Sequence, residues 1–291
     1  MRIAIIGGSG KMGLWFARHL LAEGNDIIIT GRNRQKLADV RRQLGVEVSD
    51  DPASAVDRAD AVIISVPIDS FEDVVKQLQH HLKPEQIVLD ITSVKAAPVN
   101  TMHRYLKNSR VLGTHPVFGP GAKDIRNQNF VLTPTNENET ILAGKIKKYL
   151  EERDARVTLM PPEEHDKMMA VILGLAHFIA IVSADTLLGF ENIRLMETIG
   201  GSTFKALLTL VESVISEDPV FYASLQRHLP GMAEIETAFQ KNAETWTNIV
   251  RNKDWTEFAR KMSALKEKVG KDETELKKAY ENMYKLIGGQ E

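Results

Sequence analysis

The sequence predicts an α/β protein, with a doubly wound, mostly parallel sheet in residues 1–160 and an all-helical domain in residues 161–291. Apolar, strand-like runs alternate with helical patterns up to about Met160, which is typical of a parallel sheet covered by helices on both faces. A glycine-rich turn follows the first of these runs. From Pro161 onward the strand patterns stop, so the Pro161-Pro162 pair marks the expected domain boundary.

The first expected strand, Ile3–Ile6, runs into glycines at positions 8, 10 and 13, the spacing G-x-G-x-x-G. Gly8 would allow the tight turn, Gly10 the approach of a pyrophosphate, and Gly13 the close packing of the next helix. The phosphates would then lie at the N-terminus of that helix. This pattern predicts a Rossmann-type dinucleotide site, whereas a glycine turn without any ligand is the alternative. The expected cofactor contacts in the turn are Gly8, Ser9, Gly10, Lys11, Met12 and Gly13.

The later strands complete the sheet and bring their carboxyl ends to one edge, where doubly wound sheets bind ligands. Val66 and Pro67, at the end of the fourth strand, are therefore expected to contact the cofactor. The last two strands would pair antiparallel at the sheet edge. The expected strands are Ile27–Thr30, Val46–Val48, Ala61–Val66, Ile87–Ile91, Val111–Gly113, Phe130–Thr133 and Arg156–Met160.

Helical periodicity dominates the remainder of the chain. The first of these helices is apolar on more than one face, which is typical of a helix buried in a bundle or an interface. We expect a homodimer that shares these helices, and the alternative is the core helix of a monomer. The expected helices are Glu163–Leu188, Arg194–Ser216, Pro219–Val250, Trp255–Val269 and Glu273–Ile287.

Composition narrows the function classes. The chain has 291 residues, of which 43% are hydrophobic and 26% are charged. Its net charge of −2 predicts no general electrostatic attraction to nucleic acid or to a membrane surface. It contains no cysteine, which excludes a disulfide framework, a thiolate nucleophile and a cysteine metal site. No metal site is expected. The chain opens without a signal-peptide pattern and shows no apolar run that we expect to span a bilayer, so a cytoplasmic location is expected.

The residues after the second strand indicate which nicotinamide cofactor binds. NAD sites place a carboxylate there, whereas NADP sites place an arginine. Here the strand ends in Thr30-Gly31-Arg32-Asn33-Arg34, without a carboxylate. Arg32, with Arg34, could hold a 2′-phosphate, and Thr30 and Asn33 could add hydroxyl and amide donors. We therefore expect NADP rather than NAD; a solvated basic turn is the alternative.

The chemistry is expected at the ends of the fifth and sixth strands. His115, framed by prolines and glycines in Gly113–Gly121, lies where a nicotinamide would lie, and a histidine can accept a proton near neutral pH. The fifth strand ends in Asp90-Ile91-Thr92-Ser93-Val94-Lys95 and brings Ser93 and Lys95 to the same edge. Taken alone, these two residues are as consistent with ordinary loop polarity as with catalysis.

Four segments together resemble the prephenate and arogenate dehydrogenase family: GGSGKMG, DITSVK, GTHPVFGP, and the helix start EHDKMMA followed by Leu175-Ala176-His177. The resemblance implies an NAD(P)-dependent oxidative decarboxylation of prephenate or arogenate in tyrosine biosynthesis. It also implies that His115 accepts the proton of the ring hydroxyl and that Ser93 bonds this hydroxyl and His115. His177 would meet the side-chain end of the substrate. His165 and Lys95 are further expected substrate contacts, with packing beneath the nucleotide domain as the alternative for His165.

The chain departs from the family at one position. Most members carry an arginine six residues before the proline of an Asp-Pro pair, where it binds a substrate carboxylate, and here this residue is Ser213. Because a buried carboxylate needs a cationic partner, Lys205 and Arg227 are the substitutes we consider. The C-terminal regulatory segment of some members is not expected, because the chain ends in Gly-Gly-Gln-Glu after Ile287.

Two other functions fit parts of the sequence. A deazaflavin-dependent NADP reductase or another β-hydroxyacid-type dehydrogenase would share the glycines and the basic turn, but the His115 segment disfavours it. A non-catalytic NADP-binding homologue would explain Ser213, but the joint presence of Ser93, His115, His165 and His177 disfavours it. Sequence reasoning does not distinguish prephenate from arogenate.

Overall fold

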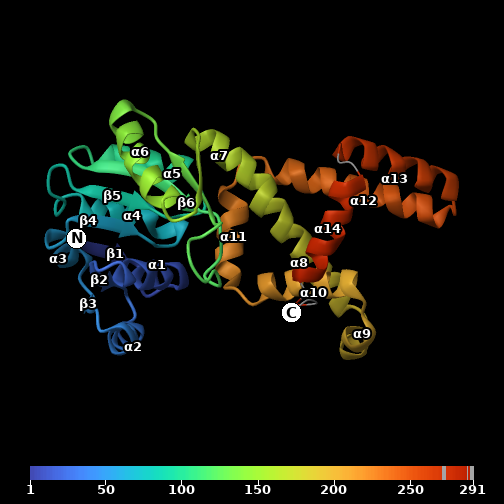
Figure 1. Ribbon diagram of the computed structural model, residues 1–291, viewed down its shortest axis with the longest axis horizontal. Coiled ribbons are helices and arrows are strands. Elements are labelled where there is room, and N and C mark those ends of the chain that lie inside the picture. Colours follow the sequence, from blue (N-terminus) through green and yellow to red (C-terminus); the bar gives the residue numbers. More distant parts are fainter. Residues whose placement is uncertain (271–272, 287, 289–291) are drawn as a thin grey trace. The chain divides into compact units, whose positions relative to one another are not determined.

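The computed structural model describes residues 1–270, 273–286 and 288, and the chain divides into two compact units (Figure 1). The first unit comprises Met1–Met169 with Arg227–Pro230, and the second comprises Ala170–Gln226 with the chain from Gly231 onward. Residues 162–169 belong to the first unit, although the domain boundary was expected before them. The helix formed by these residues therefore belongs to the compact unit of the sheet and not to that of the helices that follow it.

The first unit contains an eight-stranded sheet in the order β3-β2-β1-β4-β5-β6-β7-β8. The first six strands are parallel, β7 is antiparallel to β6, and β8 is parallel to β7. The predicted doubly wound sheet is confirmed, and of the two expected antiparallel pairings only that of β7 is found. The strands are β1 (Arg2–Ile6), β2 (Asp26–Thr30), β3 (Glu47–Ser49), β4 (Ala61–Ile64), β5 (Ile87–Asp90), β6 (Arg110–Pro116), β7 (Asn129–Thr133) and β8 (Arg156–Leu159).

Helices cover both faces of this sheet (Figure 1). The alternation along β1 shows why: Ala4 and Ile6 pack under α3, α4 and α5, whereas Ile3 and Ile5 pack under α1, α2 and α6. The strand order reverses between β1 and β4, and this reversal is where such sheets bind ligands. The helices are α1 (Lys11–Ala22), α2 (Arg34–Leu44), α3 (Pro52–Asp57), α4 (Ile68–Leu78), α5 (Ala96–Tyr105), α6 (Glu137–Glu151) and α7 (Pro162–Met169).

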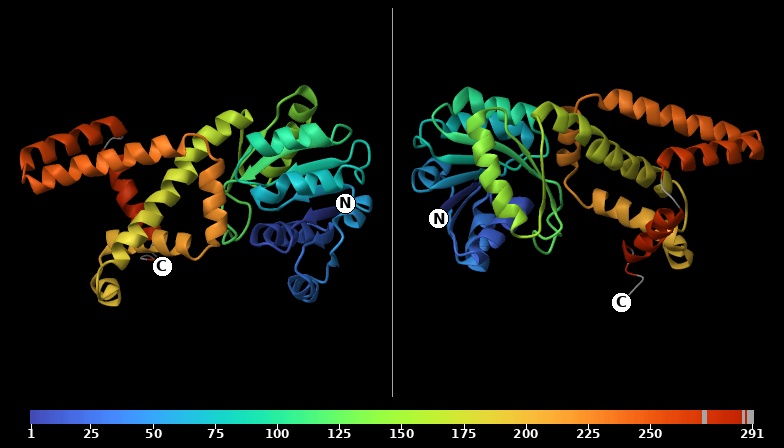
Figure 2. Two further views of the ribbon diagram at one scale, coloured as in Figure 1. Left: turned by 180° about the vertical axis from the view of Figure 1, so that it is seen from behind. Right: turned by 45° about the horizontal axis from the view of Figure 1, so that its top comes forward.

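The second unit is built from helices, as Figure 2 shows from two further directions. Two helices expected to be continuous are interrupted, one at Gly200-Gly201 and one at Pro230-Gly231, where Gly231 adopts a φ of 71°. The expected end of the last helix at Ile287 lies outside the described residues. The elements are the π-helix η1 (Ala170–Leu175) and the α-helices α8 (Ala176–Leu188), α9 (Ile193–Ile199), α10 (Ser202–Ile215), α11 (Pro219–His228), α12 (Met232–Arg251), α13 (Trp255–Val269) and α14 (Glu273–Leu286).

One helical stretch corrects an expectation from the sequence. From Pro162 to Leu188, α7, η1 and α8 form 27 residues that by length and composition could cross a membrane, whereas no such run was expected. Only 17% of its most apolar window is buried within the chain. Val171, Ile172 and Val182 of this stretch are 38–52% exposed. Apolar side chains of this helix are therefore exposed in the single chain.

Candidate active site

The glycine turn after β1 brings backbone atoms as close together as its spacing predicts, but the residue with a positive φ is one position earlier than expected. The left-handed residue is Gly7, with a φ of 77°, where a Cβ would lie 2.3 Å from the carbonyl oxygen of Ser65. A Cβ on Gly13 would lie 2.6 Å from Cα of Gly8, so α1 packs directly against the turn. The tight turn was expected at Gly8 and falls on Gly7, which sequence reasoning missed; the doubled glycine was the available signal.

The first turn of α1 has the properties of an anion site. Its N-cap residue, Gly10, has no side chain that could cap the helix and compete with an anion there. Val66 lies beside the glycine turn, and Pro67 caps α4 at the same edge of the sheet. Thr30 has another role than expected: it is buried, and its hydroxyl accepts a hydrogen bond from the Gly7 N–H at 3.4 Å. It supports the turn.

The basic turn after β2 is only partly available for a phosphate. The Asn33 side chain accepts a hydrogen bond from the Lys36 N–H at 3.0 Å and so caps α2. Arg34 donates to Asp50, with 2.9 Å between Nε and Oδ2. Arg32 is exposed, and the described residues form no ion pair with it. Of the two arginines expected to hold a 2′-phosphate, Arg32 is therefore the one without a competing carboxylate.

His115 lies on β6 at the carboxyl edge of the sheet and forms a hydrogen-bonded chain with α7. Its Nδ1 is 2.8 Å from Nε2 of His165, and Nδ1 of His165 is 2.8 Å from Oδ1 of Asp166. His115 is 4% exposed, and His165 is fully buried. A fully buried His165 cannot contact a substrate as was expected; it contacts His115 instead.

Asp166 is fixed by the start of α5. Its Oδ1 accepts the Lys95 N–H at 2.7 Å and its Oδ2 accepts the Ala96 N–H at 2.9 Å. Helix α5 has no side-chain cap of its own at Lys95, so this carboxylate from α7 takes that place. A carboxylate at a helix N-terminus is stabilised by unpaired N–H groups and by the helix dipole.

Lys95 was expected to contact the substrate, and the structure places it elsewhere. Its side chain is fully buried, and Nζ donates to the Asp90 carboxylate and to the carbonyl oxygen of Thr114, the latter at 2.6 Å. Burial lowers the pKa of Lys95, and the neighbouring Asp90 opposes this shift. Lys95 therefore ties β5 to β6 beneath His115, and a buried lysine engaged in this way is not available to a substrate.

The surroundings of His115 favour a neutral imidazole. Burial lowers the pKa of His115 well below its ordinary value of 6.5, and the nearby Lys95 ammonium shifts it in the same direction. The ring is therefore uncharged at neutral pH and can accept a proton. Ser93 lies in the loop after β5, half-buried, at the same edge of the sheet. Within the described residues no hydrogen bond joins Ser93 to His115.

The remaining expected site residues lie on helices. In the second unit, His177 packs its ring edge-to-face against Tyr222 at 4.7 Å, and its buried Nδ1 has no hydrogen-bond partner among the described residues. Burial lowers the pKa of His177. Ser213 is exposed, and its hydroxyl donates a hydrogen bond of 2.8 Å to the carbonyl oxygen of Leu210. An unpaired buried nitrogen is what a site that awaits a polar ligand would show.

The two cations considered as substitutes for the missing arginine differ. Lys205 lines a hollow of about 450 Å³ in the second unit with Glu197 and Glu212. Arg227, in the first unit, forms an ion pair with Asp69 of α4, and His228 lies 3.6 Å from the same carboxylate. Arg227, which was considered as a partner for a substrate carboxylate, is therefore paired with a carboxylate of the protein.

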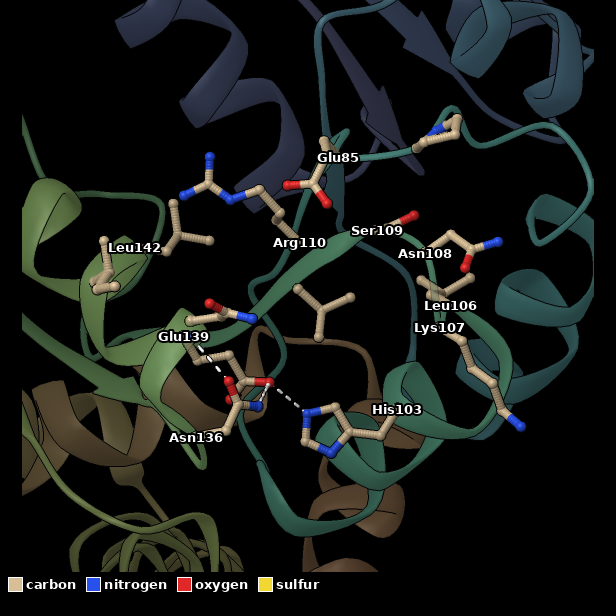
Figure 3. A pocket seen from close by; sticks show the side chains of 14 residues that line it. Glu85, His103, Leu106, Lys107, Asn108, Ser109, Arg110, Asn136, Glu139 and Leu142 are labelled. Carbon is tan, nitrogen blue, oxygen red and sulfur yellow. Dashed lines mark hydrogen bonds and ion pairs between the residues drawn. The ribbon is translucent and has the colours of Figure 1, made fainter.

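A larger hollow of about 1130 Å³ lies at the opposite edge of the sheet, where β5 and β6 begin (Figure 3). Glu139, His103 and Asn136 line it, and Glu139 is hydrogen-bonded to the other two. Thr135 donates its N–H and its hydroxyl to Glu139 as well, at 2.8 and 2.9 Å. Four polar residues of this region, His103, Thr135, Asn136 and Glu139, are thus paired among themselves.

Two family models match the chain. One is described as prephenate dehydrogenase, nucleotide-binding domain, and matches residues 16–159. The other is described as prephenate dehydrogenase, dimerization domain, and matches residues 161–264. Together they cover both halves of the chain.

Individual proteins agree with these models. A probable arogenate/prephenate dehydrogenase of Methanocaldococcus jannaschii is 32% identical over 276 residues, which are 94% of this chain. This chain spans only 62% of the length of that relative. A cyclohexadienyl dehydrogenase of Zymomonas mobilis is 30% identical over 201 residues, 65% of this chain and 68% of that protein.

The solved structures agree on the fold. The prephenate dehydrogenase of Aquifex aeolicus, in complex with hydroxyphenyl propionate and NAD+, superposes with a TM-score of 0.75 at 23% identity, covering 92% of this chain and 96% of that chain. The motif resemblance, both family models and the relatives lead to one conclusion: the chain belongs to the prephenate dehydrogenase family.

Proposed function

We propose that the protein catalyses the NADP-dependent oxidative decarboxylation of prephenate or arogenate in tyrosine biosynthesis. One observation carries the proposal: a buried, neutral His115 at the carboxyl edge of a sheet that also carries a dinucleotide-type glycine turn. A family model for the nucleotide-binding domain supports the cofactor class. A deazaflavin-type reductase would use the glycine turn but would leave His115 and its hydrogen-bonded chain without a role.

The reaction needs a base and a well-placed hydride acceptor. His115 accepts the proton of the ring 4-hydroxyl, and Ser93, at the same edge, orients that hydroxyl. The bound nicotinamide supplies the hydride acceptor for C4 of the ring. The bond between the ring and its carboxylate then breaks, carbon dioxide leaves, and the bonding electrons make the ring aromatic. His115 returns its proton to the oxygen as the phenol forms.

The substrate's other groups need partners on the helices. His177 has a buried nitrogen without a partner among the described residues, so it is our candidate for the side-chain end of the substrate. Of the two substitute cations, Lys205 remains the candidate for a carboxylate, because Arg227 is paired with Asp69. NADP is our choice of cofactor, because Arg32 is the cation after β2 that has no carboxylate partner in the described chain.

The protein acts as a homodimer in the cytoplasm under this proposal. The exposed apolar side chains between Val171 and Val182 need a cover, and the family model for this half is described as a dimerization domain. A second copy of the chain supplies such a cover, so the apolar length of this helix calls for no membrane.

The test is a turnover assay with each substrate and each nicotinamide. Reduced cofactor should appear with prephenate or arogenate, and faster with NADP than with NAD. The variant His115→Asn should lose about 100-fold or more in kcat, whereas His80→Asn, at an exposed histidine of α4's C-terminal side, should not change it. Absence of turnover with both substrates would overturn the proposal, and so would a His115→Asn variant as active as His80→Asn.

A further inference from the structure

We propose that Asp166 and His165 form a relay that fixes the tautomer and orientation of His115, which makes His165 a positioning residue. The inference rests on the proposed role of His115 as the base. It is carried by the two 2.8 Å contacts that join Asp166, His165 and His115, all three buried.

The direction of the relay follows from the chemistry of its first member. Asp166 receives two backbone N–H groups, from Lys95 and Ala96, and a carboxylate that serves only as an acceptor can receive both. Nδ1 of His165 must then carry the hydrogen that points to Asp166. Nε2 of a neutral His165 therefore has the lone pair, and it can only accept.

The contact between His165 and His115 then determines the tautomer of His115. Because Nε2 of His165 accepts, Nδ1 of His115 must carry a hydrogen and donate it. The lone pair of His115 then lies on Nε2, the nitrogen that is left for a substrate hydroxyl. In the opposite tautomer, Nε2 of His115 would carry a hydrogen and could not act as a base.

The relay also supports the charge that His115 gains. When Nε2 takes up a proton, the ring becomes cationic in a buried environment, where an unpaired charge is costly. Its Nδ1–H remains donated to His165, and the carboxylate of Asp166 lies directly behind. This is the arrangement by which an acidic residue holds a catalytic histidine without itself taking the proton.

Two substitutions of His165 separate this role from simple packing. The amide of glutamine reaches as far as Nε2, so His165→Gln keeps an acceptor for Nδ1 of His115. The amide of asparagine reaches only as far as Nδ1, so His165→Asn keeps a partner for Asp166 and loses the contact with His115. The relay predicts that His165→Asn loses about 100-fold or more in kcat, whereas His165→Gln stays within about 10-fold of the unchanged protein.

The dissociation constant of NADP should stay within about twofold in both variants, because neither touches the glycine turn. Equal loss of kcat in the two variants would overturn the relay, since a packing role would affect both alike.

A measurement without turnover keeps the relay testable if the proposed function fails. Nitrogen NMR of ¹⁵N-histidine-labelled protein at neutral pH should show His115 as a single tautomer, protonated at Nδ1. In His165→Asn the signals should shift toward a mixture of both tautomers. A His115 protonated at Nε2 in the unchanged protein would contradict the relay, whatever substrate the protein uses.

Discussion

The indole Nε1 of Trp15 donates a hydrogen bond of 2.7 Å to the carbonyl oxygen of Ala122. Trp15 lies on α1, the helix that starts at the glycine turn, and Ala122 lies in the loop that leads away from His115 and β6. The Trp15 ring also packs edge-on against Phe118 of this loop, with 4.9 Å between centroids. The helix of the proposed cofactor site therefore holds the loop that frames the proposed base.

Removing this hydrogen bond should loosen the loop. Trp15→Phe keeps an aromatic ring and leaves the half-buried Ala122 carbonyl without its donor, so we expect the free energy of unfolding to fall by about 1–2 kcal/mol. We also expect kcat to fall severalfold while the dissociation constant of NADP is nearly unchanged. Urea denaturation and steady-state kinetics measure both effects. Trp255→Phe, at an exposed tryptophan, is the control, and equal effects of the two variants would refute the prediction.

Arg32 should decide between the two nicotinamides. A charged, bidentate contact with a 2′-phosphate contributes about 1.5–3 kcal/mol, so Arg32→Ala should raise the NADP dissociation constant by about 10-fold or more. The NAD dissociation constant should barely change. Arg34→Ala is the matched control, because Arg34 is bound to Asp50. Calorimetric titration measures both constants, and a parallel change for NADP and NAD would remove Arg32 from the cofactor site.

The buried ion pair between Lys95 and Asp90 predicts an asymmetric response to mutation. Lys95→Met should lower the free energy of unfolding by about 3–5 kcal/mol, because it leaves the Asp90 carboxylate buried without a cation. Adding Asp90→Asn should restore part of this loss, since an amide still accepts the hydrogen bonds from Thr92 and carries no charge. Urea denaturation of both variants tests the coupling, and a double variant less stable than Lys95→Met would contradict it.

Stability should depend on pH through His115. Its pKa is about 6.5 in the unfolded chain and lies well below this value in the folded protein, where burial disfavours the charged ring. Below pH 6.5 the unfolded chain therefore binds a proton that the folded chain does not. The free energy of unfolding is highest above this pH and falls as the pH decreases toward the folded pKa.

Thermal unfolding followed from neutral to mildly acidic pH measures this dependence. His177, whose pKa burial also lowers, contributes in the same direction. The variant His115→Asn should lose stability less steeply on acidification than the unchanged protein. An identical slope in both would show that His115 titrates alike in the folded and unfolded chains.

Local sequence patterns were sufficient for the sheet and the glycine turn. The short apolar run of β1 and the spacing of Gly8, Gly10 and Gly13 are local properties of the sequence, so neighbouring residues alone determine them. The shift of the left-handed residue to Gly7 was harder to predict, because two adjacent glycines can both make the turn. The position of His115 at the ligand-binding edge of the sheet was also predictable from the order of the strands along the chain, because His115 lies at the carboxyl end of a parallel strand.

The partners of His115 could not be predicted in this way. His165 is 50 residues further along the chain, and only the tertiary structure brings the two rings together. Lys95 was misjudged for a related reason: lysines are rarely buried, and only the position of Asp90 explains why this one is. The exposed apolar face of the helix from Pro162 to Leu188 was ambiguous, because the same composition suits a core, an interface or a membrane.

The capping of α5 by Asp166 has a consequence for how the protein is made. The ribosome delivers residues in order, so the strands of the sheet and His115 emerge well before the segment that carries His165 and Asp166. A nascent chain that has reached only β8 has every strand of its sheet but leaves the start of α5 uncapped and the imidazole of His115 without its partner. The surroundings of the proposed base are therefore complete only once the first helix after the sheet has been synthesised.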